Sequence, residues 1–305
     1  GVASGCSLYG LKIADDEGAV AGLSIWARAI MDGANVADIV SVSWGWPPNA
    51  YYSEIANAIS FAESLGKICV FSAGNWGTRA AQGQSLAFPA NLPNVIAVGA
   101  IERDGDHWDY SSSGPELDVV APSGNYESVW VGDLYTLDNI GDLGYNPYRR
   151  SCDSTSADYI CYFGGTSAAA PQVAGVLALV KSRRPDLTGF DTLKMIIDSS
   201  ARDGVGNPFY DSAGHDIYYG NGLVSAFRAL LSVSRGDANN NGVINIVDAS
   251  YLTAFLYKGG PPPQPDTLMG DANCSGTVNM LDVSYILSFL YKAGPEPPIC
   301  FNYGD

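Results

Sequence analysis

Short apolar runs and longer runs with helical spacing alternate through the first part of the chain, and this alternation restricts the fold more than any other feature. The runs with the length and composition of strands are residues 8–13, 39–43, 68–72 and 95–100. Between them, residues 19–31 and 55–65 have the apolar periodicity of helices. Strands that alternate with helices in this way are typical of a parallel sheet covered by helices on both faces. The sequence therefore predicts an α/β domain.

A second informative segment, residues 164–175, reads Gly-Gly-Thr-Ser-Ala-Ala-Ala-Pro-Gln-Val-Ala-Gly. Its small residues surround Ser167, and the apolar residues that follow have helical spacing. Ser167 is therefore predicted at a helix N-terminus, where free N–H groups and the helix dipole favour a developing oxyanion. A serine that merely caps the helix fits this segment equally well. The segment alone leaves both interpretations open.

Further stretches resemble the subtilisin-like serine peptidases, in the order in which that family has them. They are residues 1–16, 39–45, 70–77, 88–90, 95–100, 110–122 and 220–224. The resemblance implies an α/β fold with the family's doubly wound parallel sheet, here N-terminally incomplete. It also implies that residues 1–233 form the C-terminal portion of a peptidase domain.

The resemblance carries roles for individual residues. It implies that Ser167 attacks the carbonyl of a protein or peptide substrate and forms an acyl-enzyme. The Asn75 side chain and the Ser167 backbone N–H would hold the oxyanion. Ser43, Trp44 and Gly45 would form one wall of the substrate cleft. The implied activity is that of a serine endopeptidase.

The chain departs from the family in its catalytic triad. The family's Asp and His motifs belong before the first resembling stretch, and the family orders its triad Asp, His, Ser. The two histidines present, His107 and His215, lie in polar, turn-like stretches and match neither position. Both are expected in surface loops. Because a serine without a base is a poor nucleophile, we expect the chain alone to be nearly inert. Asp and His would come from a missing N-terminal segment or a companion chain.

The charge of the chain is strongly acidic. Lys and Arg total 16 against 32 Asp and Glu, which gives a net charge of −16. This balance argues against nucleic-acid or anionic-membrane partners. It fits a secreted protein that binds cations, or solubility alone. No uninterrupted apolar run of about 18 residues is present, so no membrane span is expected.

The chain has six cysteines. Cys152 and Cys161 flank a short polar insertion and could close a loop, and Cys274 and Cys300 could pair near the C-terminus. Cys69 lies in an apolar run and is expected to be a buried small hydrophobe. An oxidising compartment follows if these pairs form. The long aperiodic stretch 123–162 that contains the first pair is expected to line the cleft or to carry a contact surface.

An internal repeat follows the change in composition near residue 234. Residues 236–239 (Gly-Asp-Ala-Asn) recur as residues 270–273, and each copy opens a loop with oxygen ligands at EF-hand spacing. The ligand positions of the first loop are Asp237, Asn239, Asn241, Val243, Asn245 and Asp248. Those of the second loop are Asp271, Asn273, Ser275, Thr277, Asn279 and Asp282. The spacing wraps oxygens around one calcium ion per loop, so two Ca²⁺ ions are predicted.

Residues 234–305 resemble a dockerin, a small α-helical module with paired calcium loops that binds cohesin modules of other proteins. The positions usual for partner recognition hold Ile246, Val247, Met280 and Leu281. They are apolar where many dockerins are polar, so a cohesin-like partner and self-assembly both stay open.

Two functions compete at this stage. The first is a secreted serine endopeptidase whose Asp and His lie outside these residues. The second is a catalytically inactive structural or assembly protein that uses the same scaffold and the dockerin-like module for protein contacts. A third reading is a cohesin-binding adaptor. Detection of the missing triad motifs, together with labelling of Ser167 by a fluorophosphonate, separates the first from the second.

Overall fold

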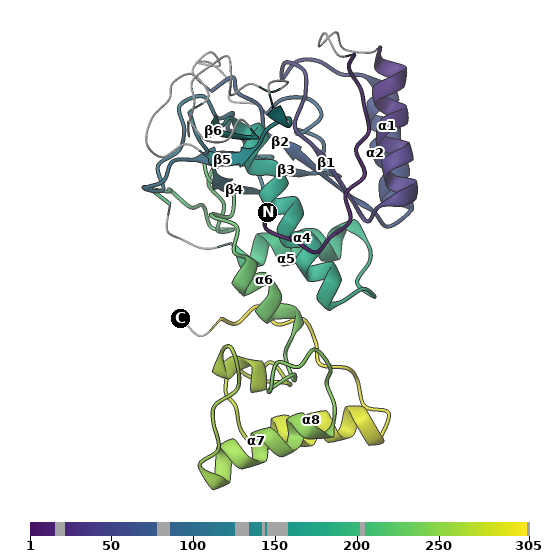
Figure 1. The fold of residues 1–305 in the computed structure, drawn as a ribbon. Coiled ribbons are helices and arrows are strands. Elements are labelled where there is room, and N and C mark those ends of the chain that lie inside the picture. The colour runs from purple at the N-terminus through teal and green to yellow at the C-terminus, as the bar shows by residue number, and fades with distance from the viewer. Residues whose placement is uncertain are drawn as a thin grey trace. The chain divides into compact units, whose positions relative to one another are not determined.

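The computed structural model describes residues 1–15, 22–77, 86–125, 134–141, 144, 158–201 and 205–303 (Figure 1). Within these residues the chain forms two compact units. The first comprises Gly1–Ala178 and Thr188–Val224, and the second comprises Leu179–Leu187 and Ser225–Asp305. The predicted boundary at residues 233/234 stays a prediction.

The first unit contains a four-stranded parallel sheet with the order β1-β2-β3-β4. Its strands are β1 (Ile39–Val42), β2 (Ile68–Ser72), β3 (Ile96–Ile101) and β4 (Val119–Pro122). Ile39 lies opposite Ile68, Val70 opposite Ile96, and Val98 opposite Val119. All residues of β2 and β3 are buried, as is typical of strands covered on both faces. The predicted α/β fold is therefore confirmed.

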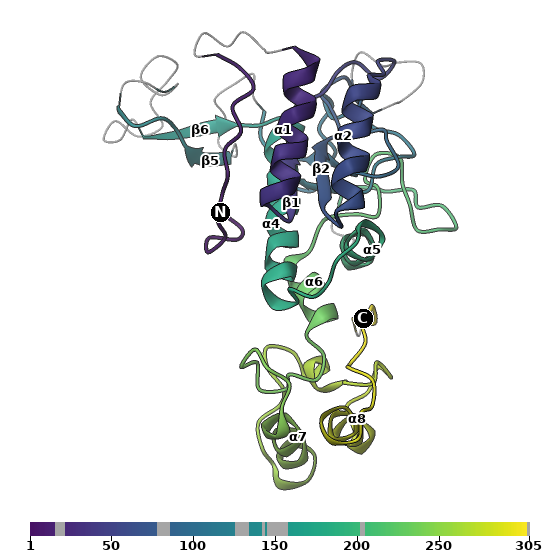
Figure 2. The ribbon, with the colours of Figure 1, turned by 90° about the vertical axis from the view of Figure 1, so that its right-hand side faces the viewer.

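Helices α1 (Leu23–Val36) and α2 (Ser53–Ser64) lie side by side against β1 and β2 (Figure 2). Their apolar stripes, which include Trp26, Ile30, Ile55 and Ile59, join the strand residues that point to that face in one buried core. In β2 and β3 the alternate residues point to the other face and are also buried, whereas Ser41 of the edge strand β1 is exposed. The two helices overlap the runs 19–31 and 55–65 that were predicted to be helical. Residues 19–21, where the first run starts, lie outside the described residues.

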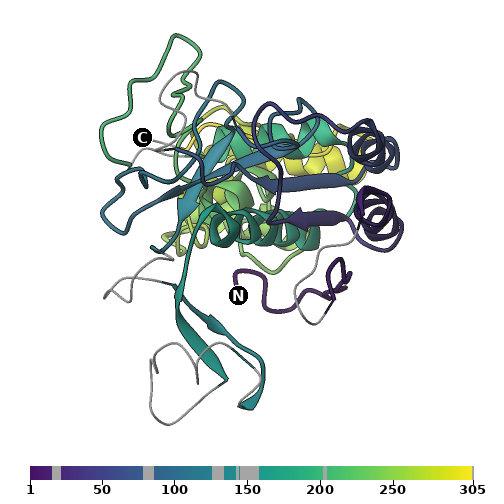
Figure 3. The ribbon, with the colours of Figure 1, turned by 90° about the horizontal axis from the view of Figure 1, so that it is seen from above.

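Helices α4 (Thr166–Arg183) and α5 (Phe190–Ser200) follow the sheet in the chain. Between β4 and α4, strands β5 (Leu134–Leu137) and β6 (Tyr159–Phe163) form a separate antiparallel pair. Seen from above, this pair extends away from the parallel sheet (Figure 3). All of it except Phe163 lies within the stretch 123–162 that was predicted to be aperiodic, and it carries the stacked rings of Tyr135 and Tyr159.

One predicted strand is wrong. Residues 8–13 run as extended chain without forming a strand. A strand exists only with hydrogen-bonded neighbours, and β1, the edge of the sheet facing this segment, pairs with β2 alone among the described residues. The side chains of Leu8, Tyr9 and Leu11 are consequently exposed.

The second unit contains α6 (Ala226–Val233), α7 (Ile246–Lys258), the 3₁₀ helix η2 (Thr267–Gly270) and α8 (Met280–Tyr291). Its core is small and joins both repeats: Ala238, Ala249, Leu252, Ala272, Val283 and Ile286. The Cys274–Cys300 disulfide predicted from the sequence is present. Cys161 is also disulfide-bonded, and its predicted partner Cys152 lies outside the described residues. Among the described helices, none has the length and apolar character that a bilayer crossing requires.

Candidate active site and calcium loops

Ser167 lies in the first turn of α4, at the carboxyl edge of the parallel sheet. The turn before it contains Gly165, whose φ of +76° suits glycine. Ser167 and Ser43, the residue that follows β1, are joined by two hydrogen bonds. The Ser167 hydroxyl donates to the Ser43 carbonyl at 3.1 Å, and the Ser43 hydroxyl donates to the Ser167 carbonyl at 2.8 Å. The structure thus brings together two residues that the sequence singled out separately.

Asn75 follows β2 and reaches the same helix start. Its side-chain oxygen accepts from the backbone N–H of Thr166 at 3.0 Å and from the Thr166 hydroxyl at 2.9 Å. The Thr166 hydroxyl in turn accepts from the Gly74 N–H at 3.1 Å. Because these bonds use the oxygen of the Asn75 amide, its Nδ2 group remains as a donor. A side chain at Gly165 would come within 3.0 Å of that nitrogen, so the glycine keeps the donor uncovered.

Thr166 is a residue that the sequence analysis did not single out. It is buried, and it links the turn after β2 to the first turn of α4 through both its backbone and its hydroxyl. The side-chain Oγ of Ser123 adds a third link by donating to the Gly165 carbonyl at 2.6 Å. The helix start that carries Ser167 is therefore fixed to the ends of three strands, which is where ligands bind in open α/β sheets.

Neither histidine contacts Ser167. His215 donates from Nε2 to the Leu117 carbonyl at 2.7 Å. His107 lies in a connecting loop, as the sequence predicted, but its side chain is half-buried and not at the surface. Its ring packs edge-on against Tyr218 and Tyr219, and burial lowers its pKa to about 4. The Ser167 hydroxyl faces a backbone carbonyl, which cannot act as a base.

Trp44 lies in a cluster of aromatic rings beside the end of β1. Its ring centroid is 3.8 Å from that of Trp26 and 5.0 Å from that of Trp46. A side chain at Gly45 would collide with the Phe88 carbonyl at 2.7 Å, so glycine is required there. The role of Ser43, Trp44 and Gly45 as a wall of the substrate cleft stays a prediction.

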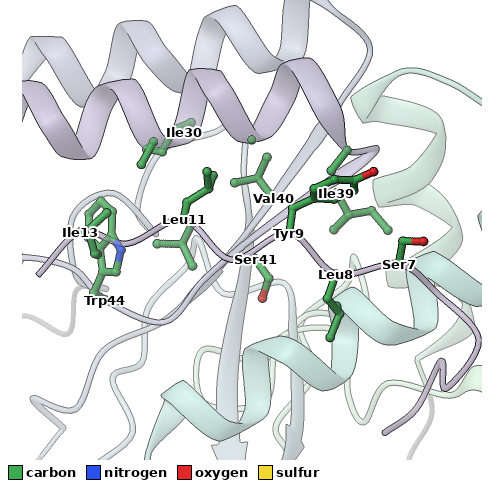
Figure 4. A pocket seen from close by; sticks show the side chains of 14 residues that line it. Ser7, Leu8, Tyr9, Leu11, Ile13, Ile30, Ile39, Val40, Ser41 and Trp44 are labelled. Carbon is green, nitrogen blue, oxygen red and sulfur yellow. The ribbon is translucent and has the colours of Figure 1, made fainter. Parts of the chain in front are cut away.

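A groove of about 230 Å³ lies between the extended N-terminal segment and the outer edge of β1 (Figure 4). Leu8, Tyr9, Leu11 and Ile13 line one side, and the lining from β1 and beyond includes Ile39, Val40, Ser41 and Trp44. The groove is largely apolar and runs along an edge whose backbone groups pair with no described strand. It reaches Trp44, the neighbour of Ser43.

In the second unit, the two predicted calcium loops have matching geometry. In the first, the Asp237 carboxylate accepts hydrogen bonds from the backbone N–H groups of Asn241 and Gly242 at 3.0 and 2.9 Å. Asp248 accepts those of Asn239 and Asn245 at 3.2 and 2.9 Å. In the second loop Asp271 and Asp282 make the corresponding four bonds. Gly242 and Gly276, at the sharp turn, have φ values of +95° and +82°.

The donor set of each loop fits a calcium ion. Asp237, Asp248, Asp271 and Asp282 are all buried. Burial raises the pKa of Asp248, and the negative charge of Asp237 adds to this effect. The pKa of Asp282 is raised in the same way by burial and by Asp271. Two buried carboxylates in one loop, with amide and carbonyl oxygens around them, fit a bound cation, and hard oxygens are the ligands that calcium prefers.

A serine hydroxyl at a helix start, beside an amide whose nitrogen bonds to no described residue, is an arrangement that serine hydrolases on α/β sheets can use. The chain belongs to the subtilase family, whose family model matches residues 1–222. A model of the dockerin type I domain matches residues 235–290. The predicted family, the α/β fold and the dockerin module are thereby confirmed.

Among curated relatives, the calcium-dependent protease of Trichormus variabilis is 30% identical over 253 residues, which cover 75% of this chain and 37% of that protein. Subtilisin DY of Bacillus licheniformis is 29% identical over 225 residues, which cover 74% of this chain and 68% of that protein. The chain thus spans little more than a third of the length of the first of these relatives.

Two solved structures support the same fold. A protease from Pseudoalteromonas arctica has a TM-score of 0.56 and 27% identity, covering 71% of this chain and 61% of its own. A lanthipeptide protease has a TM-score of 0.55 and 25% identity, covering 72% of this chain and 69% of its own.

Proposed function

We propose that the chain is the nucleophile-bearing portion of a secreted subtilisin-like serine endopeptidase. The observation that carries this proposal is the hydrogen-bond network that fixes Ser167 and Asn75 at the start of α4. If Ser167 only capped the helix, the Asn75 amide would not need to bond through Oδ1 alone. Nor would Gly165 need to leave Nδ2 of Asn75 uncovered.

In the proposed reaction, Ser167 Oγ attacks the peptide carbonyl, and a histidine takes its proton. The developing oxyanion is held by Asn75 Nδ2 and the backbone N–H of Ser167. Neither group donates to a described residue in the structure, so both can donate to the oxyanion without losing a bond. Thr166 holds the Asn75 amide in position, which makes it a positioning residue.

We further propose that the histidine and the aspartate come from polypeptide beyond these 305 residues, in a missing N-terminal segment or a companion chain. Support comes from the positions of both histidines away from Ser167 and from the groove along β1. A strand that paired with the outer edge of β1 would fill this apolar groove and end near Ser43. Residues after such a strand would then lie within reach of the Ser167 hydroxyl.

Fluorophosphonate labelling tests this proposal. The 305-residue chain alone is expected to label slowly or not at all at Ser167. Fusion to the Asp- and His-bearing N-terminal segment of a subtilase is expected to produce labelling and peptide hydrolysis, and both are lost in Ser167→Ala. A fusion that folds with an occupied β1 edge and still leaves Ser167 unlabelled would favour the alternative, an inactive scaffold for assembly.

We propose that the second unit binds two calcium ions and a cohesin-type protein partner. Ile246, Val247, Met280 and Leu281 are exposed on the first turns of α7 and α8, at equivalent positions of the two repeats. Such exposed apolar side chains at matching positions fit a protein interface. The test is calorimetric titration with cohesin modules. Binding should require calcium, and a Val247→Asp, Leu281→Asp double variant should abolish it while the calcium-bound fold is retained.

A further inference from the structure

The two calcium loops differ in the cation that lies beside their first aspartate. In the first loop, Oδ2 of Asp237 accepts a hydrogen bond from Nη2 of Arg183 in addition to the Gly242 N–H. Arg183 ends α4, and it belongs to the residues Leu179–Leu187 that pack in the second unit. The contact therefore lies within that unit.

The guanidinium of Arg183 is fixed at a second point. Its Nε donates to the Ser234 hydroxyl at 3.1 Å. Its Nη1 lies 3.3 Å from the position that a side-chain carbon at Gly242 would occupy, so it covers the sharp turn of the loop. The Arg183 side chain is 20% exposed and that of Asp237 is 2% exposed, so solvent screens this ion pair only partly.

In the second loop, the first aspartate forms a buried ion pair with Arg235 but accepts no hydrogen bond from a guanidinium of the described residues. Asp271 makes the same backbone bonds, to Ser275 and Gly276, both at 2.9 Å. The nearest guanidinium, that of Arg235, lies 4.0 Å away and donates instead to the backbone carbonyls of Leu268 and Asn302. Arg235 therefore has acceptors of its own, whereas Arg183 uses a calcium ligand as its acceptor.

A guanidinium bonded to a ligand carboxylate opposes calcium binding in two ways. It withdraws charge from an oxygen that the ion would use, and it repels a dication placed a few ångströms away. The hydrogen bond to a ligand oxygen is made in the first loop only. Repulsion acts on both loops, because Arg235 lies 4.0 Å from Asp271 in the second, but there the guanidinium leaves the ligand oxygen unbonded. The two loops otherwise have the same number of carboxylates and the same backbone bonds.

We propose that Arg183 acts as an internal counter-ion of the first loop, so that this loop binds calcium more weakly than the second and releases the guanidinium when calcium enters. This inference rests on the proposed binding of two calcium ions. Under this proposal, the contact between Arg183 at the C-terminal end of α4 and Asp237 breaks over the range of calcium concentration in which the first loop binds its ion.

The test is a calcium titration of the full 305-residue chain against a chromophoric chelator. Wild type is expected to give two binding constants that differ roughly tenfold, because a guanidinium bonded to a ligand oxygen lies closer to the ion than one 4.0 Å from that oxygen. Asp248→Asn should remove the weaker constant and Asp282→Asn the tighter one. Arg183→Gln should strengthen the weaker constant by roughly tenfold and leave the tighter one unchanged.

Two variants control for folding and for net charge. Arg183→Lys keeps the positive charge and should keep the weak constant. Arg184→Gln removes the same charge from the next residue, whose bonds go to Asp186 and Glu296, and should leave both constants unchanged. The proposal is overturned if Arg183→Gln weakens or does not alter the first loop, or if Asp282→Asn removes the weaker site. Absence of any calcium binding in wild type would instead overturn the calcium proposal on which it rests.

Discussion

The pH dependence of the first unit's stability is expected to rest on Asp198, a carboxylate of α5. Asp198 accepts from the Lys194 ammonium at 2.7 Å, and the same ammonium contacts Asp118. Burial, followed by the negative charge of Asp118, raises the pKa of Asp198 from 3.8 to about 6, although Lys194 opposes the shift. Asp198 therefore holds a proton in the folded chain, between these two pH values, that the unfolded chain has lost.

The sign of the effect follows from this difference in protons bound. Because the folded state binds more protons between about pH 4 and pH 6, its stability falls as the pH rises through that window and is level above it. A shift of about two pKa units corresponds to at most about 3 kcal/mol. Since Asp198 is 23% exposed and coupled to Lys194, we expect about 1–3 kcal/mol.

The perturbation is Asp198→Asn, which cannot titrate. Urea unfolding between pH 4 and pH 7 can be followed by tryptophan fluorescence, because all six tryptophans lie in the first unit. The variant should lose most of the decline in unfolding free energy between pH 4 and pH 6. A small decline should remain because burial also raises the pKa of Asp118. Asp191→Asn, at an exposed position of the same helix, is the matched control. If wild type and Asp198→Asn decline in parallel, the reasoning is refuted.

Three further outcomes are expected. In a triad-complete fusion, Asn75→Ala should lower kcat by roughly 10²–10³-fold with the fold intact, and an unchanged kcat would exclude Asn75 as an oxyanion donor. A thiol-reactive dye should modify the exposed Cys6 in the native chain and Cys69 only in denaturant, because burial raises the pKa of Cys69 to about 12. If peptide mapping shows that the dye modifies both cysteines of the native chain at equal rates, this expectation is contradicted. Leu252→Ala should destabilise the calcium-loaded second unit by about 2–5 kcal/mol in thermal melts followed by circular dichroism, and a loss below about 1 kcal/mol would mean that this core does not hold the unit together.

Features that depend on local spacing were predictable from the sequence. The strand predicted over residues 68–72 is β2, and the register of both calcium loops follows from ligands that lie close together in the chain. The Cys274–Cys300 pair was predictable because few cysteines lie in that region. Ser167 at a helix start was predictable because small residues precede an apolar periodicity.

Features that depend on distant residues were not predictable in this way. His107 has polar neighbours in the sequence, yet Tyr218 and Tyr219, far along the chain, cover its ring. Residues 8–13 have a strand-like pattern but no strand beside them to complete the hydrogen bonds. Thr166 looked like part of a family motif, and only the fold revealed that it orients Asn75.

The end of α4 also determines whether the C-terminal unit can be transferred as a cassette. The family match for the dockerin module begins at residue 235, but Leu179–Leu187 pack with that module, and Arg183 and Arg184 bond to Ser234, Asp237 and Glu296. A graft that began at residue 235 would leave Leu179–Leu187, with both arginines, and Ser234 behind in the donor protein. The portable module is therefore discontinuous in sequence, and a fusion partner has to supply a helix end that carries both arginines.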